Sequence, residues 1–283
     1  MSLFRIHANT AALTALSSLY RSNEGIAVRQ ARLASGKRIN TAKDDTAGYA
    51  ISRSLQSRSL GLRAALMNVQ NAKSILTIGE GGYQAQMDVL LTIKNKTVQA
   101  ADSSLNSGQR TAIRNQVNQL LTELDDISSQ AKWNGGDIFN STFTFHVGAD
   151  KDDKLAVFLS NSTSNAVGGN TVADLSSMGI TGGTFSLENT EKSAQAITQV
   201  DVAITALAGV IQNIGDTIIR LGLKADAISI TAQNTEGTLS MYEDADMAQE
   251  QIEFLKHQII QQTGISALSQ ANSSPQIVLS LFR

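Results

Sequence analysis

Apolar residues recur every seven positions along much of this chain. The most regular example lies between residues 192 and 233, where the spacing alternates between three and four residues. Its apolar positions are Ile197, Val200, Ile204, Leu207, Ile211, Ile214, Ile218, Leu221, Ala225 and Ile228. This repeat predicts an α-helix with one apolar seam, which packs against other helices at a shallow crossing angle.

Two further stretches have a similar seam. One contains Leu62, Val69, Tyr83 and Leu90, with Leu66, Leu76 and Met87 beside them, and the other contains Ile113, Val117, Leu120, Leu124 and Ile127. Pro275 is the only proline, so no earlier position forces a helix to end for lack of an N–H group. We expect a mainly α-helical protein, a long antiparallel coiled coil or helical bundle with paired N- and C-terminal helices and a small β-hairpin region.

Both ends of the chain have helical patterns but no partner helix within their own segment. At the amino end Ile6, Leu13, Tyr20, Ala27 and Ala34 recur every seven residues, with Leu19, Ile26 and Leu33 beside them. At the carboxyl end the apolar stripe consists of Ile252, Leu255, Ile259, Ile265 and Leu268. Residues 1 to about 35 are therefore predicted to pair with residues from about 245 to 283, and their remaining apolar faces to meet other subunits.

The middle of the chain has a different composition. Residues 134–190 are rich in Gly, Asn, Ser and Thr. Phe143, Phe145 and Val147 alternate with polar residues, and Leu155, Val157 and Leu159 do so after a polar turn. This alternation predicts a β-hairpin over about residues 138–160, followed by a loop over about residues 160–190.

Charge and composition exclude several kinds of partner and chemistry. The 23 basic and 25 acidic residues are spread along the chain, so we expect neither nucleic acid nor a membrane as partner. There is no cysteine, which excludes disulfides, thiolate metal sites and a cysteine nucleophile. The amino end lacks the pattern of a cleaved signal peptide, and no stretch approaches the roughly 20 apolar residues of a spanning helix.

Paired acidic residues are the main candidates for catalysis or metal binding. Asp44 with Asp45 and Asp244 with Asp246 could divide acid and base roles, but we expect them at helix starts or paired with basic residues. The turn at residues 151–154 lacks the ligand spacing of a calcium loop, and the histidines His7, His146 and His257 are scattered. We therefore predict no catalytic residue, no metal site and no cofactor.

Two long motifs at opposite ends of the chain resemble those of bacterial flagellins. The first is ASGKRINTAKDDTAGYAIS, residues 34–52, and the second is the tail from Asp244. The tail's matching positions are Gln258, Ile259, Gln262, Gly264, Ala271, Asn272, Pro275, Gln276, Val278, Leu279 and Arg283. Both motifs occur in the family's order, so the chain resembles a short flagellin with a reduced variable region.

The resemblance implies a structural subunit that self-assembles into the helical filament used for motility. Residues 1–43 with 244–283 would form a helical inner-tube domain, and residues 44–243 a rod domain with the hairpin and a short variable loop. The residues expected to pack between subunits are Ile6, Leu13, Leu16, Leu19, Ile26, Leu33, Ile252, Leu255, Ile259, Ile265, Leu268 and Leu279. A hook-filament junction protein of the same family is the alternative, and a coiled-coil signalling module is a more distant one.

The resemblance also implies an environment and a set of partners. The subunit would be extracellular, in the flagellum, after type III export without a cleaved signal peptide. Its partners would be other copies of itself, an export chaperone, and the filament cap and hook-filament junction proteins. Residues 90–99 depart from the family pattern at Thr92, Asn95 and Lys96, which puts recognition by an innate immune receptor in doubt.

Overall fold

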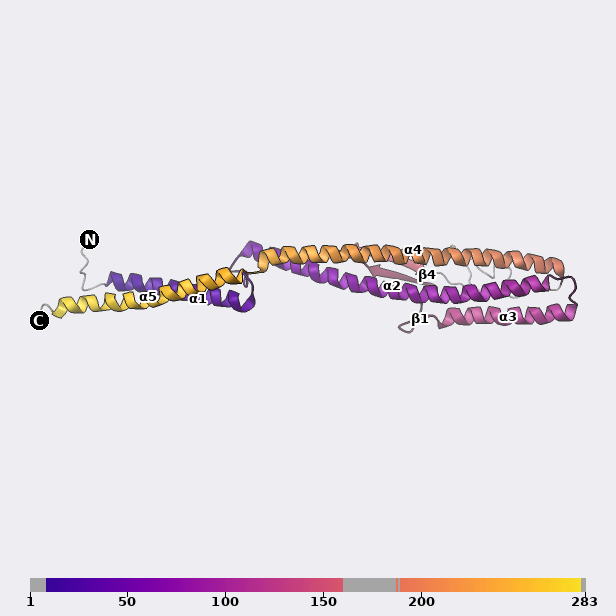
Figure 1. Ribbon diagram of the computed structural model, residues 1–283, viewed down its shortest axis with the longest axis horizontal. Coiled ribbons are helices and arrows are strands. Elements are labelled where there is room, and N and C mark those ends of the chain that lie inside the picture. The colour runs from indigo at the N-terminus through magenta and orange to yellow at the C-terminus, as the bar shows by residue number, and fades with distance from the viewer. Residues whose placement is uncertain (1–8, 160–186, 188, 281–283) are drawn as a thin grey trace. The chain divides into compact units, whose positions relative to one another are not determined.

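The computed structural model describes residues 9–159, 187 and 189–280, with side chains described as far as residue 273. These residues form five helices: α1 (Thr10–Ser35), α2 (Thr46–Ala100), α3 (Ser107–Gln130), α4 (Thr190–Glu243) and α5 (Met247–Ser280). Four short strands lie between α3 and α4: β1 (Lys132–Trp133), β2 (Gly136–Asp137), β3 (Ser141–His146) and β4 (Lys154–Leu159) (Figure 1). The mainly helical fold predicted from the sequence is confirmed. Most of the predicted variable loop lies outside the described residues.

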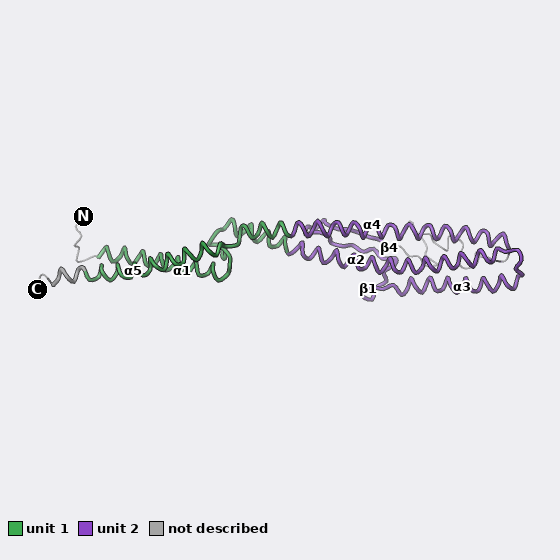
Figure 2. The backbone as a smooth tube through the Cα atoms, viewed as in Figure 1, with its two compact units in different colours: residues 1–59, 233–283 green, residues 60–232 purple. Residues whose placement is uncertain are grey.

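The chain divides into two compact units (Figure 2). Unit 1 contains residues 1–59 and 233–283, and unit 2 contains residues 60–232. The division falls inside α2 and α4, whereas the boundaries expected from the sequence, at residues 43/44 and 243/244, lie close to the start of α2 and the end of α4. The assignment of an inner-tube domain and a rod domain remains a prediction.

Unit 2 is built around the three apolar seams. Along α4 the positions Val200, Leu207, Ile214, Leu221 and Ile228 are buried. Along α2 the buried seam contains Leu62, Val69, Leu76, Tyr83 and Leu90. The α3 seam differs slightly from the prediction, because Leu121 is buried and Leu120 only half-buried. All of these buried residues belong to one continuous core.

Polar contacts fix the neighbours of α2 in unit 2. The Gln86 amide of α2 donates to the Leu124 carbonyl of α3 at 3.3 Å, and Lys94 of α2 pairs with Asp201 of α4 at 2.6 Å. In Figure 1, α3 and α4 lie on opposite sides of α2. The chain reverses direction between α2 and α3, and α4 also runs antiparallel to α2, so α2 is antiparallel to both of its neighbours in the bundle that the seven-residue repeats predict (Figure 1).

The predicted β-hairpin is present. Strands β3 and β4 pair antiparallel, with Phe143 opposite Val157 and Phe145 opposite Leu155. Alternate residues face the helices, so Leu159 is fully buried while Phe158 is half exposed. A second, smaller hairpin joins β1 to β2 through a turn with positive φ at Asn134 and Gly135. The Asn-Gly pair is the usual signal for such a turn, so its presence was readable from the sequence.

The apolar content of α4 was underestimated from the sequence. The helix contains an 18-residue stretch with a mean hydropathy of 1.5, long and apolar enough by composition to cross a membrane. Only 22% of that stretch is buried within the protein. Residues of the apolar seam, such as Leu207 and Ile214, contribute to the buried share of this stretch. Exposed apolar residues, such as Val202 and Ile219, add to its hydropathy without being buried.

Two adjacent glycines in α2 provide a matched test of packing in unit 2. A Cβ atom added at Gly82 would lie 2.8 Å from the buried ring of Phe139, whereas at Gly81 it would meet nothing within 4 Å. We predict that Gly81→Ala raises the free energy of unfolding by about 1 kcal/mol, because alanine favours the helix. Gly82→Ala should lower it by about 1 to 2 kcal/mol, because the clash outweighs the same gain. Denaturant titration followed by circular dichroism measures both values, and equal effects would contradict this packing.

Candidate functional site

Helices α1 and α5 form an antiparallel pair within unit 1, as expected from the sequence (Figure 1). Small and polar groups line the contact between them. The Ser22 hydroxyl donates to the His257 carbonyl at 2.8 Å, and the Asn9 amide donates to the Ala271 carbonyl at 2.8 Å. Asn9 also accepts the N–H of Ala12, so the same side chain caps the start of α1. These contacts fix the register of the pair.

A glycine allows the two helices to approach closely. A Cβ atom at Gly25 would lie 2.6 Å from the imidazole ring of His257, so any larger residue forces the helices apart or the ring away. Further along the pair, Leu19 packs near Gly264. At this close approach, polar groups in the contact, such as the Ser22 hydroxyl, form their hydrogen bonds with the partner helix.

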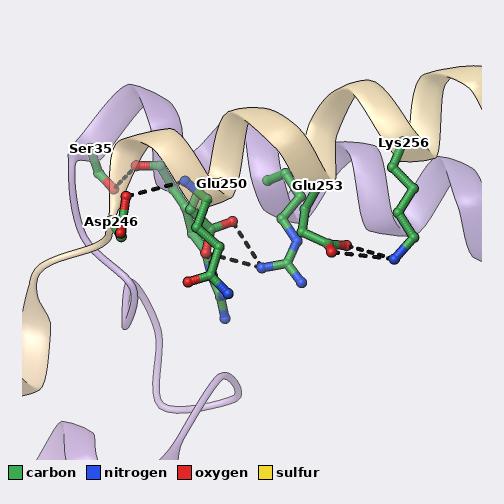
Figure 3. Close-up of polar contacts among 8 residues, drawn as sticks. Ser35, Asp246, Glu250, Glu253 and Lys256 are labelled. Atoms are coloured by element: carbon green, nitrogen blue, oxygen red, sulfur yellow. Dashed lines mark hydrogen bonds and ion pairs between the residues drawn. The ribbon is translucent and has the colours of Figure 1, made fainter.

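An ion-pair cluster closes the end of this contact. The Glu250 carboxylate of α5 accepts hydrogen bonds from the guanidinium groups of Arg29 and Arg32 of α1, at 2.8 to 3.0 Å. Glu250, labelled in Figure 3, has only 7% of its surface exposed. Burial by itself raises its pKa, but the hydrogen bonds and positive charges of Arg29 and Arg32 outweigh this and hold the pKa of Glu250 below its usual value.

Backbone and ionic contacts hold the turn after α1 against the junction between α4 and α5. Lys37 pairs with the buried Glu243 at 2.7 Å, and the N–H of Arg38 donates to the Glu243 carbonyl at 2.6 Å. The N–H of Ala245 donates to the carbonyl of Gly36, which ends α1 with a φ of 72°. Glycine adopts this left-handed conformation without the steric cost of a side chain.

The acidic pairs considered for catalysis have structural contacts. Asp45 accepts the N–H of Gly48 at the start of α2, and Asp246 accepts the N–H groups of Ala248 and Gln249 at the start of α5. Asp44 accepts hydrogen bonds from the backbone N–H groups of Asn40 and Thr41. These bonds, chiefly the one from Thr41, lower the pKa of Asp44. Within the part of the chain that the structure describes, no three His, Cys, Asp or Glu side chains are placed to hold a metal ion.

Many of the large apolar side chains of α1 and α5 point away from the contact between the helices. Leu13 is 62% exposed, Ile252 66% and Ile259 64%. Leu13 and Tyr20 are seven residues apart and therefore share one helix face, opposite the face that contains Ser22. Each helix of the pair thus carries an outward apolar face that unit 1 leaves uncovered, unlike the usual pair of amphipathic helices.

The predicted packing residues divide into three groups. Six are exposed on the outward faces, namely Leu13, Leu16, Ile252, Leu255, Ile259 and Ile265. Four are half-buried, namely Leu19, Ile26, Leu33 and Leu268. Ile6 lies outside the described residues, and the side chain of Leu279 is not among those described. Their role between subunits remains a prediction.

Sequence reasoning missed other members of this region. Ile260 and Met247 are also exposed on α5, 43% and 48% respectively, although neither fits the main stripe. The polar interior formed by Ser22, His257 and Glu250 was not anticipated either. Glu250 stands between Gln249 and Gln251, ahead of the apolar stripe, so no pattern in the sequence marks it or indicates that its partners lie on α1.

Comparison with known proteins identifies the family. The model of the bacterial flagellin N-terminal helical region matches residues 6–144, and that of the bacterial flagellin C-terminal helical region matches residues 197–282. The flagellar filament 33 kDa core protein of Treponema phagedenis is 32% identical over 98% of this chain and 99% of its own length. Flagellin FlaB2 of Treponema pallidum has the same identity and coverage, and the flagellin of Listeria monocytogenes is 29% identical over 98% of this chain and 99% of its own.

Among solved structures, a putative flagellar hook-associated protein from Vibrio parahaemolyticus is similar in fold. It has a TM-score of 0.57 over 71% of this chain and 99% of its own, at 13% identity. At that identity the likeness concerns the fold alone. The two family models together match well over half of the sequence. The chain therefore belongs to the bacterial flagellins, the structural subunits that polymerise into the flagellar filament.

Proposed function

We propose that the outward apolar faces of α1 and α5 are the contacts through which this subunit joins its neighbours in the filament. Residues 1–43 and 244–283 would then form the inner tube, surrounded by residues 44–243. The observation that carries the proposal is the exposure of Leu13, Tyr20, Ile252 and Ile259 on a helix pair whose inner contact includes polar groups such as Ser22. Apolar faces of this kind on a soluble surface mark sites of association.

Burial in a polymer accounts for this arrangement energetically. Covering one leucine or isoleucine side chain contributes roughly 1.5 to 3 kcal/mol, and several such side chains line each helix. A contact between two different patches that does not close on itself continues indefinitely and generates a helical fibre. The exposed apolar residues of α1 and α5 are not needed within the helix pair and would be free to act between subunits.

We also propose, from the family to which the chain belongs, how the subunit is exported and which other flagellar proteins it contacts. Export would proceed through the flagellar type III channel without a cleaved signal peptide, and a chaperone would cover the apolar face of α5 beforehand. The filament cap and the hook-filament junction proteins would meet the same terminal helices. The role is structural throughout, with no enzymatic activity and no cofactor.

The outward face of α5 is tested by a charge at its most exposed part. Ile259→Asp should raise the critical concentration for filament growth by roughly 100-fold, because it removes about 3 kcal/mol of burial and adds an unpaired charge. Ile259→Leu preserves the apolar area and should assemble normally. Seeded growth followed by sedimentation measures both variants, and circular dichroism checks their helix content. Normal growth of the aspartate variant would exclude this face as a subunit contact.

The Glu250 cluster predicts the response of the helix pair to acid. The pKa of Glu250 is lowered in the folded state, so its contribution to stability is full above the ordinary value of 4.5 and is lost as the pH falls through the lower, folded value. Glu250→Gln should weaken the filament at pH 7 by about 1.5 to 3 kcal/mol per subunit, because charged hydrogen bonds are lost. It should also flatten the decline of stability below pH 4.5.

Glu253→Gln is the matched control for this experiment. Glu253 lies one turn along α5 and pairs with Lys256 at 3.3 Å, at a more exposed position (Figure 3). Exposed pairs contribute at most about 1 kcal/mol, so this variant should resemble the wild type at every pH. Sedimentation of filaments after incubation between pH 7 and pH 3 compares the three proteins. Identical acid profiles for wild type and Glu250→Gln would show that the cluster does not set the response.

A further inference from the structure

A hollow on unit 2 combines an apolar floor with a basic rim. It opens where β3 and β4 lie along α4 and has a volume of about 430 Å³. Its lining consists of Val147, Lys154, Leu155, Arg220, Leu221, Leu223, Lys224 and Ala227. Lys154, Arg220 and Lys224 are exposed, so the hollow is open to solvent.

The three cations of this rim lack acidic partners. None of Lys154, Arg220 and Lys224 makes an ion pair with the described residues of the chain, although Lys94 and Lys132 of the same unit do. A fourth cation is near, since the Lys73 ammonium lies 4.0 Å from the position of a Cβ atom at Gly222. In a chain of net charge −2, these cations gather positive charge at the hollow, with Asp216 one turn before Arg220 as the nearest acid along α4.

An exposed apolar ridge on α4 runs beside the hollow. Ile219, Leu223 and Ile230 are 64%, 66% and 59% exposed. The opposite face of the same helix already supplies the core through Leu221 and Ile228. The ridge is therefore a second apolar face of α4, which the core of unit 2 does not need and which extends beyond the hollow in both directions.

We propose that this hollow and ridge dock a second copy of the chain, whose acidic end of α3 supplies the negative charge. The inference rests on the proposed function, because it requires a neighbouring subunit. Glu123 and Asp126 lie three residues apart, and the sequence has no cation between Arg114 and Lys132. Glu123 and Asp126 are exposed.

The position of these acids favours an external partner. Asp126 lies four residues before the end of α3 at Gln130, and this helix has no basic residue in its last turn. The carboxyl end of a helix carries partial negative charge, so acids there are unfavourable unless a cation is nearby. The basic rim of a neighbouring subunit would compensate both the acids and the helix end, while the apolar ridge covers adjacent surface.

The two surfaces are on different elements of unit 2. The hollow belongs to α4 and the β3–β4 hairpin, whereas the acidic group belongs to α3, and α2 lies between α3 and α4 in Figure 1. A contact between them is heterologous, and each subunit presents one half to each of two neighbours. This contact would add charge-based specificity, which an apolar stripe lacks.

A charge-reversal cycle tests the pairing. Lys224→Glu should slow seeded elongation about tenfold at low ionic strength, and Asp126→Lys should slow it similarly, because each places like charges together. The double variant Lys224→Glu with Asp126→Lys restores opposite charges and should elongate at close to the wild-type rate. The defects of the single variants should shrink as salt is added. Lys151→Glu is the matched control, since Lys151 is an exposed lysine of the same hairpin that does not line the hollow.

The outcomes separate this inference from the proposed function. If Ile259→Asp elongates seeds as fast as the wild type, the proposed function fails, because the outward face of α5 is then not a subunit contact. If the wild type elongates and the single variants do so at the same rate, only the docking inference is overturned. It is also overturned if Lys224→Glu is slow but the double variant shows no recovery, because the occupant is then not α3. Binding of anionic phospholipid vesicles that depends on Lys224, with unchanged elongation, would assign the hollow to a membrane and reject the proposal.

Discussion

The arrangement of unit 1 depends on the close antiparallel packing of α1 on α5. That packing requires a glycine at position 25, where the His257 ring occupies the space of a side chain. It brings Ser22 to the His257 carbonyl and the arginines of α1 to Glu250. Small and polar groups take up part of the inner contact beside half-buried residues such as Leu19, and other large apolar residues, such as Leu13 and Ile259, face outward. The surface available for assembly is therefore a consequence of how the two helices meet.

The two units use apolar residues in opposite ways. In unit 2 the heptad positions of α2, α3 and α4 are buried together, and residues such as Val69, Tyr83 and Leu221 are fully enclosed. That core is complete within one chain, as in ordinary helical bundles. In unit 1 residues of similar size, such as Leu13 and Ile259, are mostly exposed. Unit 2 therefore encloses its core within one chain, whereas the described residues of unit 1 leave its outward apolar faces uncovered.

Much of the fold was accessible from local patterns. Half of the positions predicted for the α4 seam are buried and the other half are half-buried, and the alternation around Phe143 and Val157 predicted the pairing of β3 with β4. The flagellin motifs at the two ends agreed with the family that the comparisons show. Errors occurred where neighbouring positions are equally apolar, as with Leu120 and Leu121, because periodicity alone does not determine the angle at which a helix faces its partners.

The sequence by itself determined the helices, the hairpin, the pairing of the two ends and the family, because each depends on local periodicity, turn chemistry or an extended motif. Only the tertiary structure decided which face of each terminal helix is turned inward. Leu13 and Leu19 are equally apolar, yet Leu13 is exposed and Leu19 packs near Gly264. The choice depends on contacts between residues more than 200 positions apart, such as Arg29 with Glu250 and Ser22 with His257. Such contacts depend on register and close approach in space, which no spacing along the chain encodes.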